Sequence, residues 1–345
     1  MTSSPQLYEH QTPYMDEINR TLRPSPAHGP KVLDLFAGCG GLALGFEAAG
    51  FETHGFEVDA DCCRTYNHNL GAKCSQTFLT PESDLPVASV IIGGPPCQPF
   101  SVGGKQQGRR DSRDGFPAFI SAVERLRPNV CLFENVRGLF YRNRWYLEQT
   151  LARLSDLGYI VDCKLLNAVD FGVPQNRERV VVVGHHGGFR FPPKVPRRTT
   201  AGEVLGTFAA TVPPQSKFLT PSMDDYVARY EKASACVRPR DLDLNKPART
   251  LTCRNLAGAT GDMHRIRLAD GRRRRLLLRE AARLQSFPDW FEFHGGETSQ
   301  FNQVGNAVPP LLAYRLAQAV KDYLSLSCCE PAVIDTSRQL MLLGV

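Results

Sequence analysis

The stretch KVLDLFAGCGGLALGFEAAG, residues 31–50, decides the fold. It starts with a short apolar run, passes through a glycine-rich turn at 38–41, and continues with small and apolar residues at helical spacing. A strand followed by a glycine turn and a helix is the first half of a βαβ unit. The turn itself, Gly38-Cys39-Gly40-Gly41-Leu42-Ala43, fits the pattern G-x-G-x-x-A, which lets a backbone approach a ligand closely.

Apolar strands and helices alternate from this stretch to about residue 190. Further strands are predicted at 52–59, 87–94, 129–136, 160–168 and 179–186, with helices between most of them. Such alternation predicts an α/β fold with a mainly parallel sheet, covered by helices on both faces.

The alternation stops after about residue 190. Residues 187–270 are rich in Pro, Gly, Thr and Arg, with short strand-like runs and few helices, and a helix is predicted again at 277–287; this predicts a smaller, irregular, β-containing domain. Residues 309–326 predict a long amphipathic helix that returns to the sheet. The expected organisation is an N-terminal arm at 1–30 with a short helix over 14–22, a main domain of 31–190 with 304–326, the smaller domain at 191–303, and a tail at 327–345.

Composition sets only broad limits. The chain has 345 residues, 42% of them hydrophobic, and a net charge of +6, so it permits a large core and a polyanionic partner without requiring the latter. No stretch has the length of a membrane span and no apolar signal region is seen, so we expect a soluble, intracellular protein. The 11 cysteines are scattered without a C-x-x-C pair, so neither a disulfide framework nor a metal site is expected.

Four features that could carry chemistry lie at the ends of predicted strands: the glycine turn, Glu57, Cys97 and Glu134. Ligands of parallel sheets bind beyond the carboxyl ends of the strands, so we expect these features to form one site. Glu57 is placed to accept hydrogen bonds from ribose hydroxyls. The pattern predicts an adenosine-type cofactor without separating a dinucleotide from S-adenosylmethionine, and a purely structural glycine turn is the alternative.

The stretch GGPPCQPFS, residues 93–101, places Cys97 directly after a buried strand. Two prolines fix φ and two glycines allow a sharp turn, which together hold the thiol rigidly; a merely buried thiol would need no such support. An ordinary thiol is only slightly ionised at neutral pH, so a nucleophilic cysteine needs a partner. Glu134 ends the next buried strand, where desolvation favours the protonated acid, and is the predicted partner.

From these residues outward, the chain resembles the DNA (cytosine-5)-methyltransferases of bacterial restriction-modification systems over roughly residues 31–326. Six motifs occur in the family's order: DLFAGCGG (34–41), GGPPCQPFS (93–101), ENVRG (134–138), QNRERV (175–180), LLREAARLQSFPD (277–289) and QVGNAVPP (303–310). The resemblance implies a Rossmann-like S-adenosylmethionine-dependent methyltransferase sheet and a small target-recognition domain at 191–303.

The resemblance also implies a reaction, namely methyl transfer from S-adenosyl-L-methionine to C5 of a cytosine in a specific double-stranded DNA sequence. Cys97 would attack C6, and protonated Glu134 would donate to N3. Arg179 would hold O2 and Arg177 a phosphate. Because a stacked cytosine cannot present C6 to a thiol, the base would be flipped out of the duplex.

The resemblance assigns two sets of binding residues. The implied cofactor residues are Phe36, Gly38, Cys39, Gly41, Glu57, Val58, Pro95, Asn306 and Val308. Two departures weaken the adenine contacts: Gln76-Thr77-Phe78 stands where the family has an Asp-Ile pair, and Val58 where an aromatic residue often stands. The implied DNA-binding residues are Ser101, Lys105, Gln106 and Arg113 in a loop, and Thr250 and Arg254 in the element ARTLTCR (248–254).

Other polar residues of the smaller domain are further candidates for base or phosphate contacts. They are Asn255, His264, Arg265, Arg267 and the arginine run 272–275, for which a solvated turn is an equal alternative. The expected partners are double-stranded DNA and a cognate restriction endonuclease that acts on the same site without contact. We expect a monomer, no membrane, and a place near the nucleoid in the cytoplasm of a bacterium or phage-infected cell.

Three rival functions stay open at this point. An RNA (tRNA) cytosine-5 methyltransferase would carry a Cys-Phe-Thr signature in the smaller domain, and the sequence has none there. A nicotinamide oxidoreductase would leave Cys97, Glu134 and the two arginines without a role. An inactive DNA-binding module would not need Cys97 and Glu134 intact.

Overall fold

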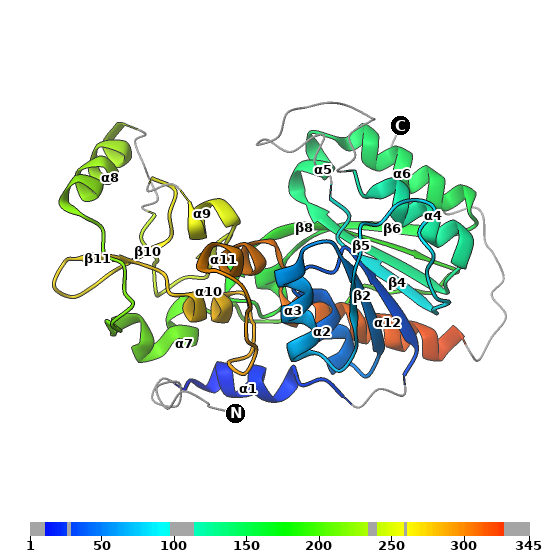
Figure 1. The fold of residues 1–345 in the computed structure, drawn as a ribbon, viewed down its shortest axis with the longest axis horizontal. Coiled ribbons are helices and arrows are strands. Elements are labelled where there is room, and N and C mark those ends of the chain that lie inside the picture. Colours follow the sequence, from blue (N-terminus) through cyan, green and yellow to red (C-terminus); the bar gives the residue numbers. More distant parts are fainter. Residues whose placement is uncertain (1–10, 26–28, 97–113, 234–239, 259–260, 328–345) are drawn as a thin grey trace.

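The computed structural model describes residues 11–25, 29–96, 114–233, 240–258 and 261–327. Five predicted site residues lie outside the described residues: Cys97, Ser101, Lys105, Gln106 and Arg113. The described chain forms a larger lobe built on a sheet and a smaller lobe beside it (Figure 1). Among the helices in the described ranges, none is long and apolar enough to cross a membrane.

The larger lobe contains a seven-stranded sheet in the order β3-β2-β1-β4-β5-β8-β6. The first five strands in this order run parallel, whereas β8 pairs antiparallel with both β5 and β6. The α/β fold with a mainly parallel sheet is therefore confirmed. The strands are β1 (Lys31–Leu35), β2 (Glu52–Glu57), β3 (Cys74–Gln76), β4 (Val90–Gly93), β5 (Val130–Val136), β6 (Ile160–Asn167) and β8 (Glu178–His185).

The antiparallel strand β8 follows from the length of its connection. Only residues 168–177 join β6 to β8, and they contain one short 3-10 helix, Ala168–Phe171, and the two-residue strand β7 (Gln175–Asn176). A parallel crossover needs a dozen or more residues and usually a helix, so this short connection returns the chain antiparallel.

Helices cover both faces of the sheet, as predicted. Alternate strand residues pack on opposite sides: Val90, Ile92 and Leu132 face α2 and α12, whereas Ile91 and Phe133 face α4 and α6. Burial on both faces explains why the strands are continuous apolar runs. The helices are α2 (Gly41–Ala48), α3 (Ala60–Asn69), α4 (Phe116–Leu126), α5 (Arg137–Tyr141), α6 (Arg144–Asp156) and α12 (Pro310–Ser327).

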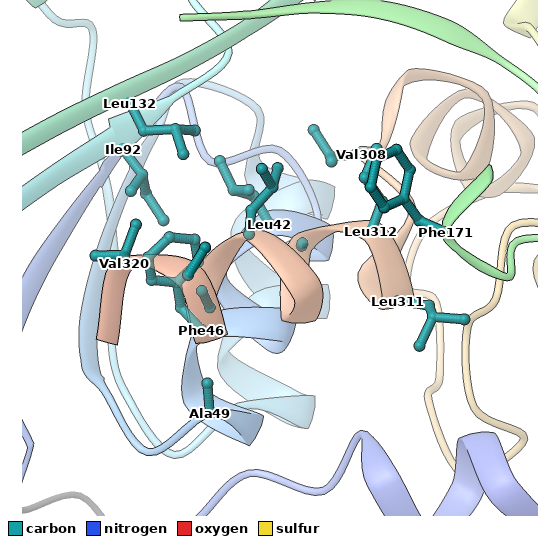
Figure 2. Close-up of a cluster of buried hydrophobic side chains, with 14 of the residues drawn as sticks. Leu42, Phe46, Ala49, Ile92, Leu132, Phe171, Val308, Leu311, Leu312 and Val320 are labelled. Atoms are coloured by element: carbon teal, nitrogen blue, oxygen red, sulfur yellow. The ribbon is translucent and has the colours of Figure 1, made fainter. Parts of the chain in front are cut away.

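The predicted return of the C-terminal helix to the sheet is confirmed. Leu312 and Val320 of α12 lie in the same buried cluster as Leu42 and Phe46 of α2 (Figure 2). The two helices approach so closely that a Cβ at Gly45 would lie 2.4 Å from the backbone nitrogen of Tyr314. The last described helix therefore completes the core of the first βαβ unit.

The smaller lobe is irregular, as predicted, with short helices and two-stranded pairings. The strand β7 of the larger lobe pairs in parallel with β9, and β10 pairs antiparallel with β11. The expected boundary at residue 303 falls inside α11. The elements are α7 (Ala201–Leu205), the 3-10 helix Gly206–Ala210, α8 (Pro221–Ala233), β9 (Ala248–Arg249), α9 (Cys253–Ala257), β10 (Arg265–Arg267), β11 (Arg273–Arg275), α10 (Leu278–Leu284) and α11 (Glu297–Asn306).

The N-terminal segment is packed where the structure describes it. Helix α1 (Pro13–Thr21) begins at the cap Thr12, whose side chain accepts a hydrogen bond from the backbone of Met15. Met15 and Ile18 are buried in the main core. This confirms the short helix, but the helix is anchored by apolar burial rather than belonging to a loose arm.

Candidate functional site

The ends of four neighbouring strands bring the predicted site residues to one edge of the sheet. Leu35 at the end of β1 pairs with Phe56 of β2 and with Gly93 of β4, and Gly93 pairs with Phe133 of β5. The residues that follow these positions are the glycine turn, Glu57, the Pro95-Pro96 segment and Glu134. The parallel register thus assembles groups far apart in the sequence, as expected for a ligand site.

The Glu57 carboxylate is held by three backbone N–H groups. One oxygen, Oε2, accepts from Gly38 at 2.9 Å, and the other accepts from Val58 at 2.8 Å and Asp59 at 2.9 Å. Phe36 and Gly38 have φ of 61° and 55°, so the turn is built from left-handed backbone. A Cβ at Gly38 would meet no protein atom within 4 Å, so the turn borders open space beside a fixed carboxylate. This arrangement fits a nucleoside.

The segment after α11 forms another wall of the same region. A Cβ at Gly41 would lie 2.5 Å from the carbonyl oxygen of Val308, so only glycine permits this approach. The thiol of Cys39 donates to the carbonyl of Gln303 at 3.7 Å, and burial raises the pKa of that thiol to about 12. Asn306 is exposed and accepts a hydrogen bond from the Cys253 thiol at 2.9 Å. The glycine turn and the 306–308 segment are therefore neighbours.

Two further residues of this region were not identified from the sequence. Asp34, at the start of DLFAGCGG, is buried, and burial followed by the charge of Glu57 raises its pKa well above the usual range. Phe78 is exposed, and the preceding residue, Thr77, donates to the Glu57 carbonyl at 2.7 Å. Where the family has an Asp-Ile pair, Gln76 thus donates to the carbonyl of Val58 and Thr77 to that of Glu57, and the exposed Phe78 follows directly in the chain.

Glu134 and Arg179 form a buried ion pair. Arg179 Nε lies 2.7 Å from Glu134 Oε1, and both side chains are only 10% exposed. The antiparallel pairing of β5 with β8 creates this contact. Arg179 stands opposite Val136, and Glu134, two residues before Val136, lies on the same face of the sheet. Burial lowers the pKa of Arg179, while the adjacent carboxylate opposes that shift. The predicted acid and one of the two predicted arginines therefore act as a unit.

The Glu134 carboxyl faces the chain that leads to Cys97. A Cβ at Gly94 would lie 3.8 Å from Glu134 Oε2. Asn135 Nδ2 donates to the carbonyl of Pro95 at 2.8 Å, and the backbone of Gly115 donates to that of Pro96 at 3.0 Å. The diproline segment is therefore tied on two sides. Asn135 was missed from the sequence, although it lies next to Glu134 in ENVRG.

Arg177 is not placed as expected. Its side chain is 1% exposed, and Nη1 donates to the carbonyl of Leu251 at 2.7 Å. Nη2 donates to the carbonyls of Gly305 at 3.0 Å and Ala307 at 2.9 Å. Burial, and then the charge of Arg179, lowers the pKa of Arg177 well below its usual range. With both terminal nitrogens committed to backbone carbonyls, this arginine is not available for the predicted phosphate contact.

Two buried glutamines extend this polar network. Gln175 Oε1 accepts from the backbone of Leu251 at 2.8 Å, and its Nε2 donates to Gln285 Oε1 at 2.7 Å. Gln285 Nε2 donates to the carbonyl of Val304 at 2.8 Å. Together with Arg177, they join the Thr-Leu element of the smaller lobe to the end of α11. Both glutamines lie inside motifs quoted from the sequence, but their identity alone did not indicate this role.

Several predicted contacts of the smaller lobe are structural instead. Asn255 is buried in the capping box of α9 with Thr252, and His264 is 1% exposed. Arg265 is fully buried between Asp241, at 2.6 Å from Nε, and Glu231, at 2.9 Å from Nη2. These three side chains are therefore not available to DNA as the sequence suggested.

The arginine run 272–275 is only partly within β11: Arg274 is buried on one face of the strand, Arg273 and Arg275 are half-buried on the other, and Arg272 precedes the strand. Arg274 and Glu280 form an ion pair at 2.7 Å in which both side chains are 0% exposed. Arg272 remains exposed, as do Arg267 and Arg254, whereas Thr250 is half-buried and donates to the carbonyl of Asn176 at 2.6 Å. The run is thus neither a simple phosphate clamp nor a solvated turn. Within the described ranges, no group of three or more His, Cys, Asp or Glu side chains could hold a metal ion.

Comparisons with known proteins agree with this geometry. The family model described as C-5 cytosine-specific DNA methylase matches residues 30–205 and 222–322. The Type II methyltransferase M.AplI of Arthrospira platensis is 59% identical over 295 residues, covering 84% of this chain and 85% of the relative. M1.HphI of Haemophilus parahaemolyticus is 36% identical over 323 residues, covering 84% of this chain and 86% of the relative.

Solved structures share the fold at lower identity. A mutant of Spodoptera frugiperda DNMT2 superposes with a TM-score of 0.64 at 17% identity, covering 85% of this chain and 100% of that one. The Dnmt2 methyltransferase of S. pombe gives a TM-score of 0.63 at 16% identity, covering 85% and 99%. At these identities the neighbours establish the fold alone.

Proposed function

The chain belongs to the C-5 cytosine-specific DNA methylases and is thus an S-adenosylmethionine-dependent DNA cytosine-5 methyltransferase; from that premise we propose that it acts on a flipped-out cytosine through a covalent bond between Cys97 and C6. The observation that carries this proposal is the buried Glu134–Arg179 pair at the edge of the sheet, facing the fixed Pro95-Pro96 segment that leads directly to Cys97.

The chemistry explains why an acid and a thiol are needed together. C5 of cytosine is a weak nucleophile, and attack by the Cys97 thiolate on C6 breaks the aromaticity and moves electron density to C5. Glu134 would take up a proton from solvent and donate it to N3, which prevents negative charge from accumulating on the ring. Arg179, already beside Glu134, holds O2. Once C5 carries the methyl group, its proton would pass to a base or water and N3 would return its proton to Glu134, so that the C6–sulfur bond breaks and the ring is restored.

The described residues fit the cofactor. It supplies an electrophilic methyl group on a sulfonium sulfur. Glu57, oriented by three backbone N–H groups, would accept hydrogen bonds from the ribose hydroxyls. The turn at Gly38 leaves room for the nucleoside, and the 306–308 segment borders the same region. The exposed side chains of Val58 and Phe78 offer apolar surface for the adenine.

The smaller lobe would read the DNA sequence. Thr250 and the exposed Arg254 are its retained candidates, and Ser101, Lys105, Gln106 and Arg113 are proposed to contact DNA from the segment outside the described residues. Several relatives are named as Type II methyltransferases of bacteria. We therefore extend the proposal to a monomer that acts near the nucleoid in the cytoplasm, with a restriction endonuclease of the same specificity that does not contact it.

The test combines a chemical trap with sequencing. A duplex containing 5-fluorocytosine cannot lose a C5 proton, so the adduct should persist as a protein–DNA band in a denaturing gel. Cys97→Ser should abolish this band and all plasmid methylation seen by bisulfite sequencing, whereas the matched control Cys163→Ser, on the sheet's last strand β6, should retain both. An adduct that survives Cys97→Ser would overturn the proposal. A parallel arm with tRNA checks the RNA alternative, which predicts methylation there and none on DNA.

A further inference from the structure

The chain directly beyond Glu134 carries an unusual composition. Strand β5 runs into the segment RGLFYRNRWY, residues 137–146, which contains three arginines, four aromatic residues and no acid. It forms α5 and the first turn of α6. Neither the predicted DNA-binding residues nor the reaction proposed above gives this segment a role.

Most of its charged and aromatic side chains are exposed. Tyr141 is 57% exposed and Trp145 is 42% exposed, which is unusual for large aromatic residues. The side chains of Arg137 and Arg144 are 61% and 68% exposed, and Arg142 is exposed as well. These five exposed residues are together called here the α5 surface.

The positive charge of the α5 surface is only loosely neutralised. Arg137 pairs with Glu178 at 2.7 Å and stacks over the ring of Tyr141 at 5.1 Å, and Arg144 pairs with Glu148 at 2.8 Å. No described carboxylate lies within ion-pair distance of Arg142. Exposed pairs of this kind contribute at most about 1 kcal/mol, so a phosphate can displace the carboxylates.

The α5 surface adjoins the reacting groups. Val136, the last residue of β5, pairs with Arg179, and Glu178, the partner of Arg137, precedes Arg179 in the chain. Because strands rise about 3.3 Å per residue, Arg137 lies roughly 10 Å along the chain from Glu134. Figure 1 shows α5 at the end of β5 and β8 that lies toward the smaller lobe.

We propose that the α5 surface binds the phosphate backbone of the DNA duplex beside the flipped cytosine. The proposal rests on the function proposed above, since it requires the target base to lie at Glu134. A duplex carries about one negative charge per 1.7 Å of axis, so phosphates must pass within reach of a surface this close to the site. Arginine forks match phosphate geometry, and the exposed aromatic rings offer packing for the sugars.

Phosphate contacts of this kind position the duplex but do not read its sequence. The α5 surface therefore contributes affinity equally on specific and unrelated DNA. The double substitution Arg142→Gln/Arg144→Gln removes two such contacts. The matched control is Arg153→Gln, which removes an exposed, ion-paired arginine from the far end of the same helix, α6.

Binding of a fluorescein-labelled duplex is measured by anisotropy across a salt series, with the methylated sequence and with a scrambled one. Each lost phosphate contact should reduce the slope of log K against log salt by about 0.9. From about 50 to 200 mM salt, the affinity of the double variant should thus fall roughly 12-fold less than that of the wild type. Arg142→Glu should weaken binding further at low salt, and Arg153→Gln should leave the slope unchanged.

Three outcomes would overturn the proposal: an unchanged slope in the double variant, an equal change in Arg153→Gln, or a loss confined to the specific duplex. A fourth outcome would identify a protein interface instead and would also overturn the proposal. In that case the protein self-associates in sedimentation, Tyr141→Ala abolishes the self-association, and the arginine substitutions leave DNA binding unchanged. Failure of the function proposed above is distinguishable, because the wild-type protein would then methylate no DNA.

Discussion

The strongest prediction concerns Arg177, for which sequence and structure suggest different roles. Arg177→Met keeps a long apolar stem and removes the guanidinium. In the described structure this leaves the buried carbonyls of Leu251 and Gly305 without a donor, whereas Ala307 still receives Gln285 at 3.2 Å. An unsatisfied buried polar group costs about 1–3 kcal/mol, so the free energy of unfolding should fall by about 2–6 kcal/mol.

The assay is thermal denaturation followed by circular dichroism, together with the salt dependence of DNA binding. Arg177→Lys should also destabilise the protein, because one ammonium cannot reproduce a fork that reaches three carbonyls. Arg153→Met, which breaks only an exposed pair with Glu124, should cost at most about 1 kcal/mol. If Arg177→Met denatures at the wild-type temperature while the salt slope falls by about 1, Arg177 is a phosphate ligand and the reasoning is refuted.

Three further predictions follow from buried groups. Glu280→Gln breaks the buried pair with Arg274 and should lower the free energy of unfolding by about 3–5 kcal/mol in urea denaturation. Gly41→Ala should displace the Val308 carbonyl, cost about 1–3 kcal/mol and raise KM for S-adenosylmethionine in a methylation assay. Burial lowers the pKa of His264 to about 3, so between about pH 6.5 and 3 the unfolded chain takes up a proton that the folded protein does not. The free energy of unfolding should therefore fall by up to about 1.4 kcal/mol per pH unit as the pH drops through this range.

Each of these predictions has a control. Arg272→Gln removes an exposed arginine from the same run as Arg274 and should change stability by less than about 1 kcal/mol. Gly296→Ala, where a Cβ would meet no atom within 4 Å, should leave KM for S-adenosylmethionine unchanged. His264→Gln should flatten the acid dependence of urea denaturation; an equally steep dependence in that variant would show that other groups cause it.

The fold and the place of the site were predictable from sequence because they depend on local signals. Apolar runs separated by helices at 31–186 predict strands buried on both faces, and the turn at 38–41 needs backbone that glycine adopts most easily. The carboxyl ends of parallel strands lie along one edge of the sheet, so Glu57 and Glu134 are both expected near that edge. Even the antiparallel β8 follows from a short connection, which is itself visible in the sequence.

Sequence by itself thus determined that this chain is an α/β methylase with Glu57 and Glu134 at strand ends, since periodicity and motif order are properties of neighbours along the chain. Only the tertiary structure decided which arginines face solvent. Arg177 finds its carbonyls 74, 128 and 130 residues away, and the partner of Arg265 at Glu231 lies 34 residues away. A long cationic side chain can turn outward to a phosphate or inward to a buried acceptor, and the choice depends on packing that brings distant segments together.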